Sequence, residues 1–300
     1  MYNYKLCRGE GNPAMNPNRI KFLKQEVFMY PTIRLNSSYD MPLLGLGLYK
    51  ATDPVETREA ISAAAMLGYR LFDTASVYKN EELVGEGIAE CGVPRKDLFI
   101  TTKIWNNAQR VGNIESSFER SLERLGLDYI DLYLIHWPVP GFYLDTWHVL
   151  EDLVHSGKLR SIGVSNFSTR DLDNLIEHSS IIPAVNQIEY HPYFDQSGIR
   201  MFCQECGIAV QAYSPLARGK YLDDPTLIMI AEKYHRSTAQ IGLRWTIQKG
   251  VAVIPKSVRS ERILENSQIF DFELNEEEMA MIDSLNQNYR SASIPEDMLR

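Results

Sequence analysis

The sequence predicts an α/β protein, a (β/α)8 TIM barrel with an N-terminal β-hairpin and extra C-terminal helices. From residue 45 onward, eight short apolar runs alternate with amphipathic stretches of helical period, which is typical of parallel β/α units. The runs are nearly continuous in apolar residues, as expected for strands that are covered on both faces. The competing fold, a doubly wound open sheet, normally carries a glycine-rich fingerprint after its first strand. The segment 45–50, GLGLYK, lacks the third glycine, so the barrel is favoured.

The elements follow one another along the chain. Residues 32–35 and 41–44, joined by a turn at 36–38, predict the hairpin. The predicted strands span 45–49, 71–73, 98–104, 130–136, 161–164, 184–189, 208–213 and 251–255. The predicted helices lie near 54–67, 81–91, 112–125, 145–156, 169–178, 197–206, 225–248, 259–266 and 275–285. The stretch 225–248 is expected to hold two helices, because Ser237 and Thr238 offer a new N-cap after His235.

The charge balance excludes several classes of partner. The chain has 31 lysine and arginine residues and 39 aspartate and glutamate residues, which gives a net charge of 31 − 39 = −8. A general nucleic-acid or anionic-membrane surface is therefore not expected. No apolar run approaches the roughly 18 residues of a membrane span. We expect a cytoplasmic protein whose partner is a small molecule. With no obvious exposed apolar stripe, a monomer is expected.

Residues 1–30 differ in composition from the rest of the chain, since they are rich in Asn, Pro, Gly and Lys and show no sustained hydrophobic period. They lack the central apolar run of a signal peptide, and their low serine content disfavours a transit peptide. We expect a mobile extension before a single catalytic domain at 31–300, with Met29 as a candidate start.

Cysteine usage is sparse. Four cysteines in 300 residues do not make a disulfide framework. Cys203 and Cys206 have metal-like spacing, but no second pair accompanies them. Reduced thiols in a helix or loop, and no metal site, are therefore expected.

Polar side chains gather where the predicted strands end. In a (β/α)8 barrel the chemistry lies at the C-terminal ends of the strands. Seven of the eight strands end in such groups: Asp73 and Tyr78, Lys103 and Trp105, His136 and Trp137, Ser165 and Asn166, Gln187 and Glu189, Tyr213 and Ser214, Lys256 and Ser257. An unpaired buried charge costs several kcal/mol, so Asp73 and Lys103 are expected to pair.

From about residue 32 to residue 288 the chain resembles the aldo-keto reductase family. The motifs are DTASVYKNEELVG from Asp73, LGLDYIDLYLIHWP from Leu125, GVSNF from Gly163, and IPKS from Ile254 with Arg262, Glu265 and Asn266. The likeness is to short-loop members, such as prostaglandin F synthases and diketogluconate reductases. It implies an NADP-dependent carbonyl reductase. It also implies that Tyr78, Asp73, Lys103 and His136, here called the candidate tetrad, are catalytic.

The chemistry of these four residues can be argued without the family. Carbonyl reduction delivers hydride to carbon and a proton to oxygen, and Tyr78 is a candidate acid with an ordinary pKa of about 10. An ammonium about 4 Å away stabilises a phenolate by about 4 kcal/mol at a dielectric near 20, or about 3 pKa units. Burial opposes this, so Lys103 is expected to lower the pKa of Tyr78 by less. Asp73 would keep Lys103 protonated, and His136 would donate a hydrogen bond to the carbonyl oxygen.

The resemblance also implies a nicotinamide cofactor across the rim of the barrel. Tyr213 would stack on the nicotinamide, with Ser165, Asn166 and Gln187 bonding its carboxamide. Further contacts implied are those of Ser214, Leu216 and Arg218 with the pyrophosphate, and those of Glu265 and Asn266 in the cofactor signature. Lys256, Ser257 and Arg262 form a basic cluster that suits a 2′-phosphate, so NADPH is predicted over NADH.

The substrate itself is not selected by the sequence. Tyr49, Trp105 and Trp137 are the expected apolar walls of the pocket, although many family members have Trp where Tyr49 stands. The loop after Pro138 is brief and the tail stops at Arg300, so an open pocket with a broad carbonyl range is expected. Two rival functions stay open: a Schiff-base aldolase with Lys103 as nucleophile, and a barrel that binds the cofactor without turnover.

Overall fold

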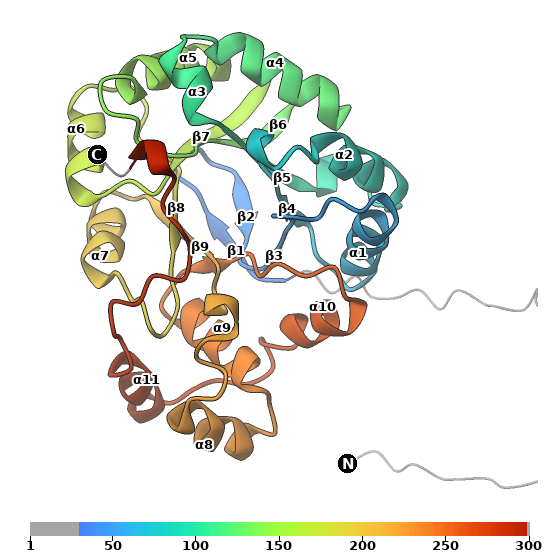
Figure 1. Ribbon diagram of the computed structural model, residues 1–300, viewed down its shortest axis with the longest axis vertical. Coiled ribbons are helices and arrows are strands. Elements are labelled where there is room, and N and C mark those ends of the chain that lie inside the picture. Colours follow the sequence, from blue (N-terminus) through green and yellow to red (C-terminus); the bar gives the residue numbers. More distant parts are fainter. Residues whose placement is uncertain (1–29, 299–300) are drawn as a thin grey trace, which may run out of the picture.

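The structure is a computed structural model that describes residues 30–298 (Figure 1). The predicted mobile extension lies outside the described residues except for its last residue, Tyr30. That residue is half-buried, and its ring stacks on Phe270 at 5.3 Å and packs edge-on against Tyr69. Tyr30 is therefore part of the folded domain.

Eight parallel strands form the barrel in chain order, which confirms the predicted fold class. They are β3 (Gly45–Gly47), β4 (Leu71–Asp73), β5 (Phe99–Ile104), β6 (Ile130–Ile135), β7 (Leu159–Ser165), β8 (Val185–Glu189), β9 (Ala209–Tyr213) and β10 (Ala252–Val253). Parallel bridges from Leu44 to Val253 and from Gly47 to Lys256 join the first strand to the last and close the cylinder.

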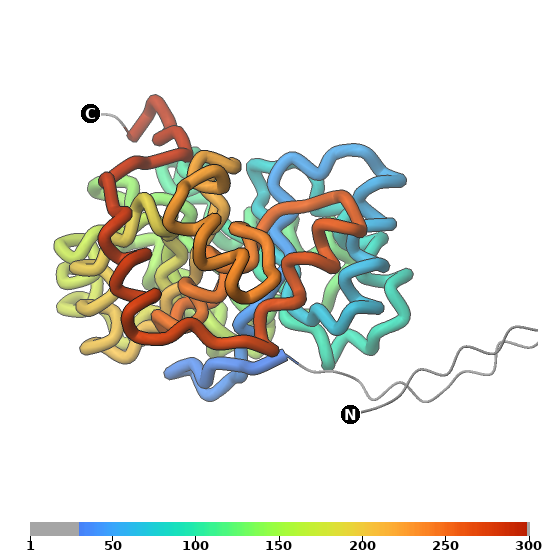
Figure 2. The backbone as a smooth tube through the Cα atoms, turned by 90° about the horizontal axis from the view of Figure 1, so that it is seen from below, coloured from blue at the N-terminus to red at the C-terminus, as the bar shows by residue number. Residues whose placement is uncertain are grey.

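The predicted hairpin is also present. Strands β1 (Thr32–Arg34) and β2 (Asp40–Pro42) pair antiparallel. Figure 2 shows this hairpin at one end of the molecule, away from the end reached by the C-terminal tail. It lies at the floor of the barrel, opposite the C-terminal ends of the strands.

Helices surround the barrel (Figure 1). They are α1 (Pro54–Met66), α2 (Glu81–Glu90), α3 (Asn106–Arg110), α4 (Ile114–Leu125), α5 (Tyr143–His155), α6 (Thr169–Glu177), α7 (Ser197–Glu205), α8 (Pro225–Tyr234), α9 (Thr238–Gln248), α10 (Ser260–Ser267) and α11 (Glu276–Asp283). Among the described residues, the short 3-10 turns are η1 (Ser76–Tyr78), η2 (Arg95–Asp97), η3 (Ala217–Gly219) and η4 (Glu296–Met298). Residues 225–248 do form two helices, and Ser237 caps the second in a capping box with Gln240. The five-residue helix α3 was not predicted, since it is too short to show a helical period.

Two apolar layers follow from the alternation of side chains along each strand. On β4, Phe72 points outward into the layer between strands and helices, whereas Leu71 points into the barrel. Leu35 and Met41 of the hairpin segment close the inner layer at the floor. The same alternation places Asp73 inside the barrel at its opposite end.

No helix among residues 30–298 is both long enough and apolar enough to cross a membrane. Cys203 is buried on α7 and Cys206 follows the helix end, and both carry free thiols. Within the described part of the chain, no group of three or more His, Cys, Asp or Glu side chains could hold a metal ion.

Candidate active site

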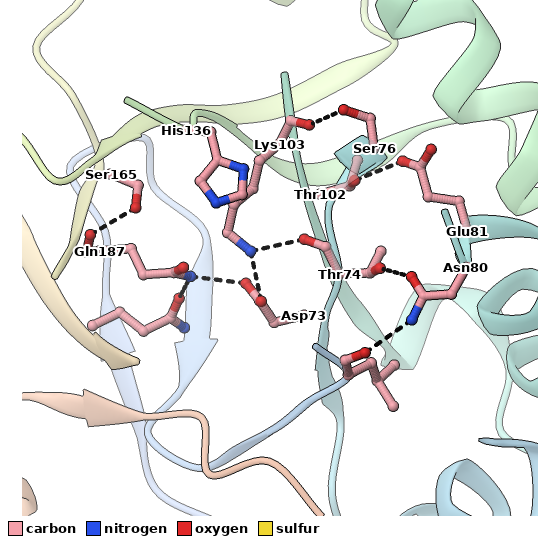
Figure 3. A network of polar contacts seen from close by, with 12 residues as sticks. Asp73, Thr74, Ser76, Asn80, Glu81, Thr102, Lys103, His136, Ser165 and Gln187 are labelled. Carbon is pink, nitrogen blue, oxygen red and sulfur yellow. Dashed lines mark hydrogen bonds and ion pairs between the residues drawn. The ribbon is translucent and has the colours of Figure 1, made fainter. Parts of the chain in front are cut away.

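Asp73 and Lys103 form a buried ion pair between neighbouring strands. Asp73 ends β4 and Lys103 lies near the end of β5, and Lys103 is fully buried. The Lys103 Nζ donates to Asp73 Oδ1 at 2.6 Å and to the Thr74 carbonyl at 2.7 Å (Figure 3). The pairing expected from the sequence is therefore present. It also opposes a Schiff-base mechanism, which needs an unpaired neutral lysine.

Tyr78 and His136 lie at the same end of the barrel. Tyr78 ends the 3-10 turn η1, directly after β4, and the Lys103 Nζ lies 5.3 Å from its ring centroid. The ring of His136, which follows β6, meets the Tyr78 ring edge-on at a centroid distance of 5.8 Å. The structure thus brings the whole candidate tetrad together at one mouth.

The loop that carries Tyr78 is fixed by buried hydrogen bonds (Figure 3). Asn80 accepts from Thr74 Oγ1 at 2.7 Å and donates to the carbonyls of Leu48 and Ala51. Ser76 Oγ donates to the Lys103 carbonyl at 2.8 Å, which ties η1 to β5. These contacts determine where Tyr78 lies relative to Lys103.

The pKa of Tyr78 differs from the sequence-based expectation. Burial raises the pKa of Tyr78 well above 10, and the negative charge of Asp73 acts in the same direction. The expected lowering by Lys103 was wrong because the ammonium is already neutralised by Asp73, while burial of the phenol disfavours its charged form. Tyr78 is consequently a protonated phenol at neutral pH.

The pKa values of the other three tetrad residues also shift in the directions that burial dictates. Burial lowers the pKa of His136 well below 6.5, with the charge of Lys103 as a second cause, so the imidazole is neutral. Its Nδ1 is buried and has no hydrogen-bond partner among the described residues. Burial raises the pKa of Asp73 and lowers that of Lys103, while their mutual attraction opposes both shifts.

Three of the residues predicted to bind the nicotinamide and its carboxamide are joined to one another by hydrogen bonds. Asn166, in the left-handed region at φ 64°, donates from Nδ2 to Ser165 Oγ at 3.0 Å and to the His136 carbonyl at 3.1 Å. Tyr213 donates its hydroxyl to Asn166 Oδ1 at 2.7 Å. Gln187 is placed differently, because its Nε2 donates inside the barrel to Asp73 Oδ2 and to Gln211 Oε1.

The residues predicted to line the phosphates lie in a strained loop. Ser214, Ala217 and Arg218 have positive φ values of 47°, 45° and 52°, although none is glycine. Such backbone conformations cost energy and cluster at ligand-binding loops. Leu216 is half-buried between them, and Arg218 is exposed.

The basic cluster follows β10. Lys256 and Arg262 are exposed, and Ser257 is buried with its Oγ accepting from the Arg259 backbone N–H at 3.0 Å. In residues 30–298, neither Lys256, Arg262 nor Arg218 makes an ion pair with a carboxylate. Of the remaining signature residues, Asn266 is buried on α10 and Glu265 is half-buried, with its carbonyl accepting from Gln240.

The three aromatic residues predicted to line the substrate pocket differ in their exposure and in their neighbours. Tyr49 packs edge-on against Tyr78 at 5.0 Å, and Trp105 packs edge-on against His136 at 5.0 Å. Tyr49 is 45% exposed, whereas Trp137 is only 9% exposed and lies 6.0 Å from the guanidinium of Arg290. Tyr49 and Trp105 therefore border the tetrad directly, while Trp137 lies beneath the C-terminal tail.

The tail contacts were missed from the sequence. The fully buried carboxylate of Glu189 accepts from the backbone N–H groups of Ser291 and Ala292, and Figure 2 shows the tail reaching this end of the barrel. Farther along, Asp297 pairs with Arg110 on α3 at 2.6 Å. The tail has no hydrophobic period, so no sequence signal indicated where it lies.

Comparisons with known proteins agree on one family. The model of the aldo/keto reductase family matches residues 43–287. The chain is 49% identical over 268 residues to the glyoxal reductase of Bacillus subtilis, covering 89% of this chain and 97% of that protein. It is 47% identical over 271 residues to the 9,11-endoperoxide prostaglandin H2 reductase of Trypanosoma cruzi, covering 89% and 96%. The crystal structure of a Bombyx mori aldo-keto reductase in complex with NADP is 42% identical, with a TM-score of 0.84 over 89% of this chain and 96% of that one.

Proposed function

The chain belongs to the aldo/keto reductase family, and from this premise we propose that Tyr78 is the general acid of its carbonyl reduction. The protein is an NADP-dependent oxidoreductase, with NADPH/NADP+ as cofactor. The observation that carries the proposal is the buried Lys103–Asp73 ion pair, 2.6 Å long, beside the phenol of Tyr78.

The residues of this chain fit that cofactor. The exposed cations Arg218, Lys256 and Arg262 match a ligand with several phosphates, and cations at the ribose end favour a 2′-phosphate. Ser165, Asn166 and Tyr213 would hold the nicotinamide end beside His136. When bound, NADPH supplies the hydride that adds to the carbonyl carbon.

Each member of the candidate tetrad then has a role that its environment supports. Tyr78 keeps its proton at neutral pH and gives it to the carbonyl oxygen as negative charge develops there. The neutral ring of His136 donates a hydrogen bond to the same oxygen and orients it. Lys103 stabilises the phenolate that remains, and Asp73 keeps Lys103 charged although both side chains are buried.

The substrates proposed for a first test are small aldehydes and dicarbonyls. The relative that is 49% identical is named a glyoxal reductase, and Tyr49, which packs against Tyr78, is partly exposed. The test follows NADPH absorbance, and then NADH absorbance, with methylglyoxal and 4-nitrobenzaldehyde. Consumption of NADPH with either carbonyl is expected. NADPH binding without any turnover of either compound would instead favour a non-catalytic barrel.

The preference for NADPH gives a prediction at Arg262. An Arg262→Ala variant is expected to raise KM for NADPH by about tenfold, because a charge-assisted contact contributes about 1.5–3 kcal/mol. KM for NADH should be almost unchanged, since NADH has no 2′-phosphate. Steady-state kinetics with both cofactors measure the ratio.

The matched control is Arg34→Ala, which removes a positive charge from the hairpin at the floor of the barrel. It should change neither KM. An Arg262→Ala variant with an unaltered NADPH:NADH ratio would show that this cation does not contact the 2′-phosphate.

A further inference from the structure

A chain of buried polar contacts crosses the barrel interior from its floor to the candidate tetrad. Gln211 Nε2 donates to Met41 Sδ at 3.6 Å, and Gln187 Nε2 donates to Gln211 Oε1 at 2.6 Å. Gln187 Nε2 also donates to Asp73 Oδ2 at 2.8 Å (Figure 3). Met41 and Gln211 are fully buried, and Gln187 and Asp73 are 2% exposed.

The position of Gln211 in the barrel needs an explanation. Its register partner on β8 is Gln187, and its neighbours in the inner layer include Ala209 and Val185. A buried amide among apolar side chains costs free energy unless it is hydrogen-bonded. An apolar residue would fill this layer at no such cost, so the amide is explained by the contacts that it makes.

The two ends of this contact chain fix the direction of both amides. The thioether of Met41 can only accept, so Gln211 turns its N–H toward the floor and its carbonyl toward Gln187. The ionised carboxylate of Asp73 can also only accept, so Gln187 turns its N–H toward Asp73. A flipped Gln211 amide would bring two NH2 groups face to face. Both hydrogens of Gln187 Nε2 are thus used, one for Gln211 and one for Asp73.

We propose that Gln211 is a positioning residue for carbonyl reduction, which acts through Gln187 to hold Oδ2 of Asp73. Gln187 then binds one oxygen of the carboxylate while Lys103 binds the other, at 2.8 Å and 2.6 Å. The carboxylate cannot rotate without breaking one of these bonds. The proposal rests on the proposed roles of Asp73 and Lys103, and it gives the amide nitrogen of Gln187 a task separate from cofactor binding.

The groups that act on Asp73 come from several elements. Lys103 on β5 carries the nearest positive charge, and Gln187 on β8 supplies a neutral donor. The phenol of Tyr78 on η1 is influenced by the charge of Asp73 and lies near Tyr213 on β9, while His136 follows β6 beside Lys103. Loss of the Gln187 bond would leave Lys103 as the side-chain donor to Asp73, so the pKa of Asp73 would rise.

The main test is Gln211→Met, which keeps the volume and removes the acceptor for Gln187. Without this acceptor the Gln187 amide is free to turn, and loss of its hydrogen bond to the charged Asp73 carboxylate is enough to change kcat by about tenfold. We therefore expect kcat for NADPH-dependent methylglyoxal reduction to fall by about tenfold. The acidic limb of the pH profile of kcat should move to higher pH. The Kd for NADPH, measured by quenching of protein fluorescence, should change by less than about twofold.

A second variant and a double mutant keep the test decisive. Met41→Leu conserves the packing but frees the Gln211 amide to turn, so a smaller shift of the acidic limb in the same direction is expected. In an Asp73→Asn background, Gln211→Met should cost nothing further in kcat, because both act on one carboxylate. Gln248→Met is the matched control. It removes an amide that bonds the Leu274 backbone, and it should leave the pH profile unchanged.

The outcomes that overturn the proposal are distinct from failure of the proposed function. A folded Gln211→Met protein with wild-type kcat and pH profile would show that Gln211 only fills space. A tenfold weaker Kd for NADPH with unchanged kcat would place its effect on the cofactor instead. If the wild-type protein reduces no carbonyl compound, the proposed function itself fails, whatever the variants do.

Discussion

Replacement of Tyr78 by phenylalanine is expected to lower kcat for carbonyl reduction by about 10²- to 10⁴-fold, the usual contribution of a positioned general acid. The change removes one hydroxyl and keeps the ring that packs against Tyr49 and His136. NADPH binding should be unaffected, since none of the residues proposed to hold the cofactor is changed. Single-turnover absorbance measurements with saturating NADPH would measure the chemical step directly.

Tyr133→Phe provides the control for this experiment. Tyr133 is a fully buried tyrosine on β6 whose hydroxyl has no hydrogen-bond partner among the described residues, and it packs against Phe118 in the outer layer. Loss of that hydroxyl should leave kcat near the wild-type value. Near-normal reduction by Tyr78→Phe would mean that another group donates the proton.

Replacement of Asp73 by asparagine is expected to lower kcat at neutral pH by about 10²-fold and to destabilise the fold by about 3 kcal/mol. The asparagine is nearly isosteric but leaves Lys103 without a counter-charge in a fully buried site. Burial already lowers the pKa of Lys103, and Asp73 opposes that shift. Without Asp73 the ammonium is therefore lost at a lower pH, and the phenolate of Tyr78 loses its stabilisation.

The pH dependence of this variant should be opposite in sign to that of the wild-type protein. On acidification the wild-type protein loses kcat as Asp73 takes up a proton, and burial raises the pKa at which this happens. In Asp73→Asn, acidification restores the Lys103 ammonium, so kcat should rise. Profiles of kcat against pH for both proteins would measure this contrast.

Asp131→Asn is the matched control, since Asp131 is also a buried aspartate in an ion pair, with Arg95 at 2.6 Å and Arg160 at 2.9 Å. Asp131 lies near the N-terminal end of β6, away from the tetrad. This variant should lose stability but keep the wild-type pH profile of kcat. Parallel pH profiles for the Asp73 and Asp131 variants would contradict the role assigned to Asp73.

The barrel could be predicted because its pattern is local and repeated. Each strand is an apolar run of a few residues, and each helix has its own period and often its own cap, as at Ser237. Helix α3 escaped prediction because five residues are too few to show a period, and its bonds to the tail join residues 191 and 187 positions apart. The hairpin was predicted, but its task of closing the inner layer with Met41 was not.

The gathering of the candidate tetrad could be predicted for a related reason. Parallel strands in a barrel all end at the same mouth, so polar residues at successive strand ends must meet there. Asp73 and Lys103 lie on neighbouring strands, which made their pairing a direct inference from charge and burial.

The sequence by itself determined the barrel, the family resemblance and the set of groups at the mouth, because these depend on short periodic patterns and on where strands end. Only the tertiary structure decided the direction of the pKa shift at Tyr78, since desolvation and compensation by Asp73 depend on three-dimensional burial. It also decided the contacts of Gln187 with Gln211 and of Glu189 with the tail. Hydrogen bonds between residues far apart in the chain require distances that no linear pattern encodes.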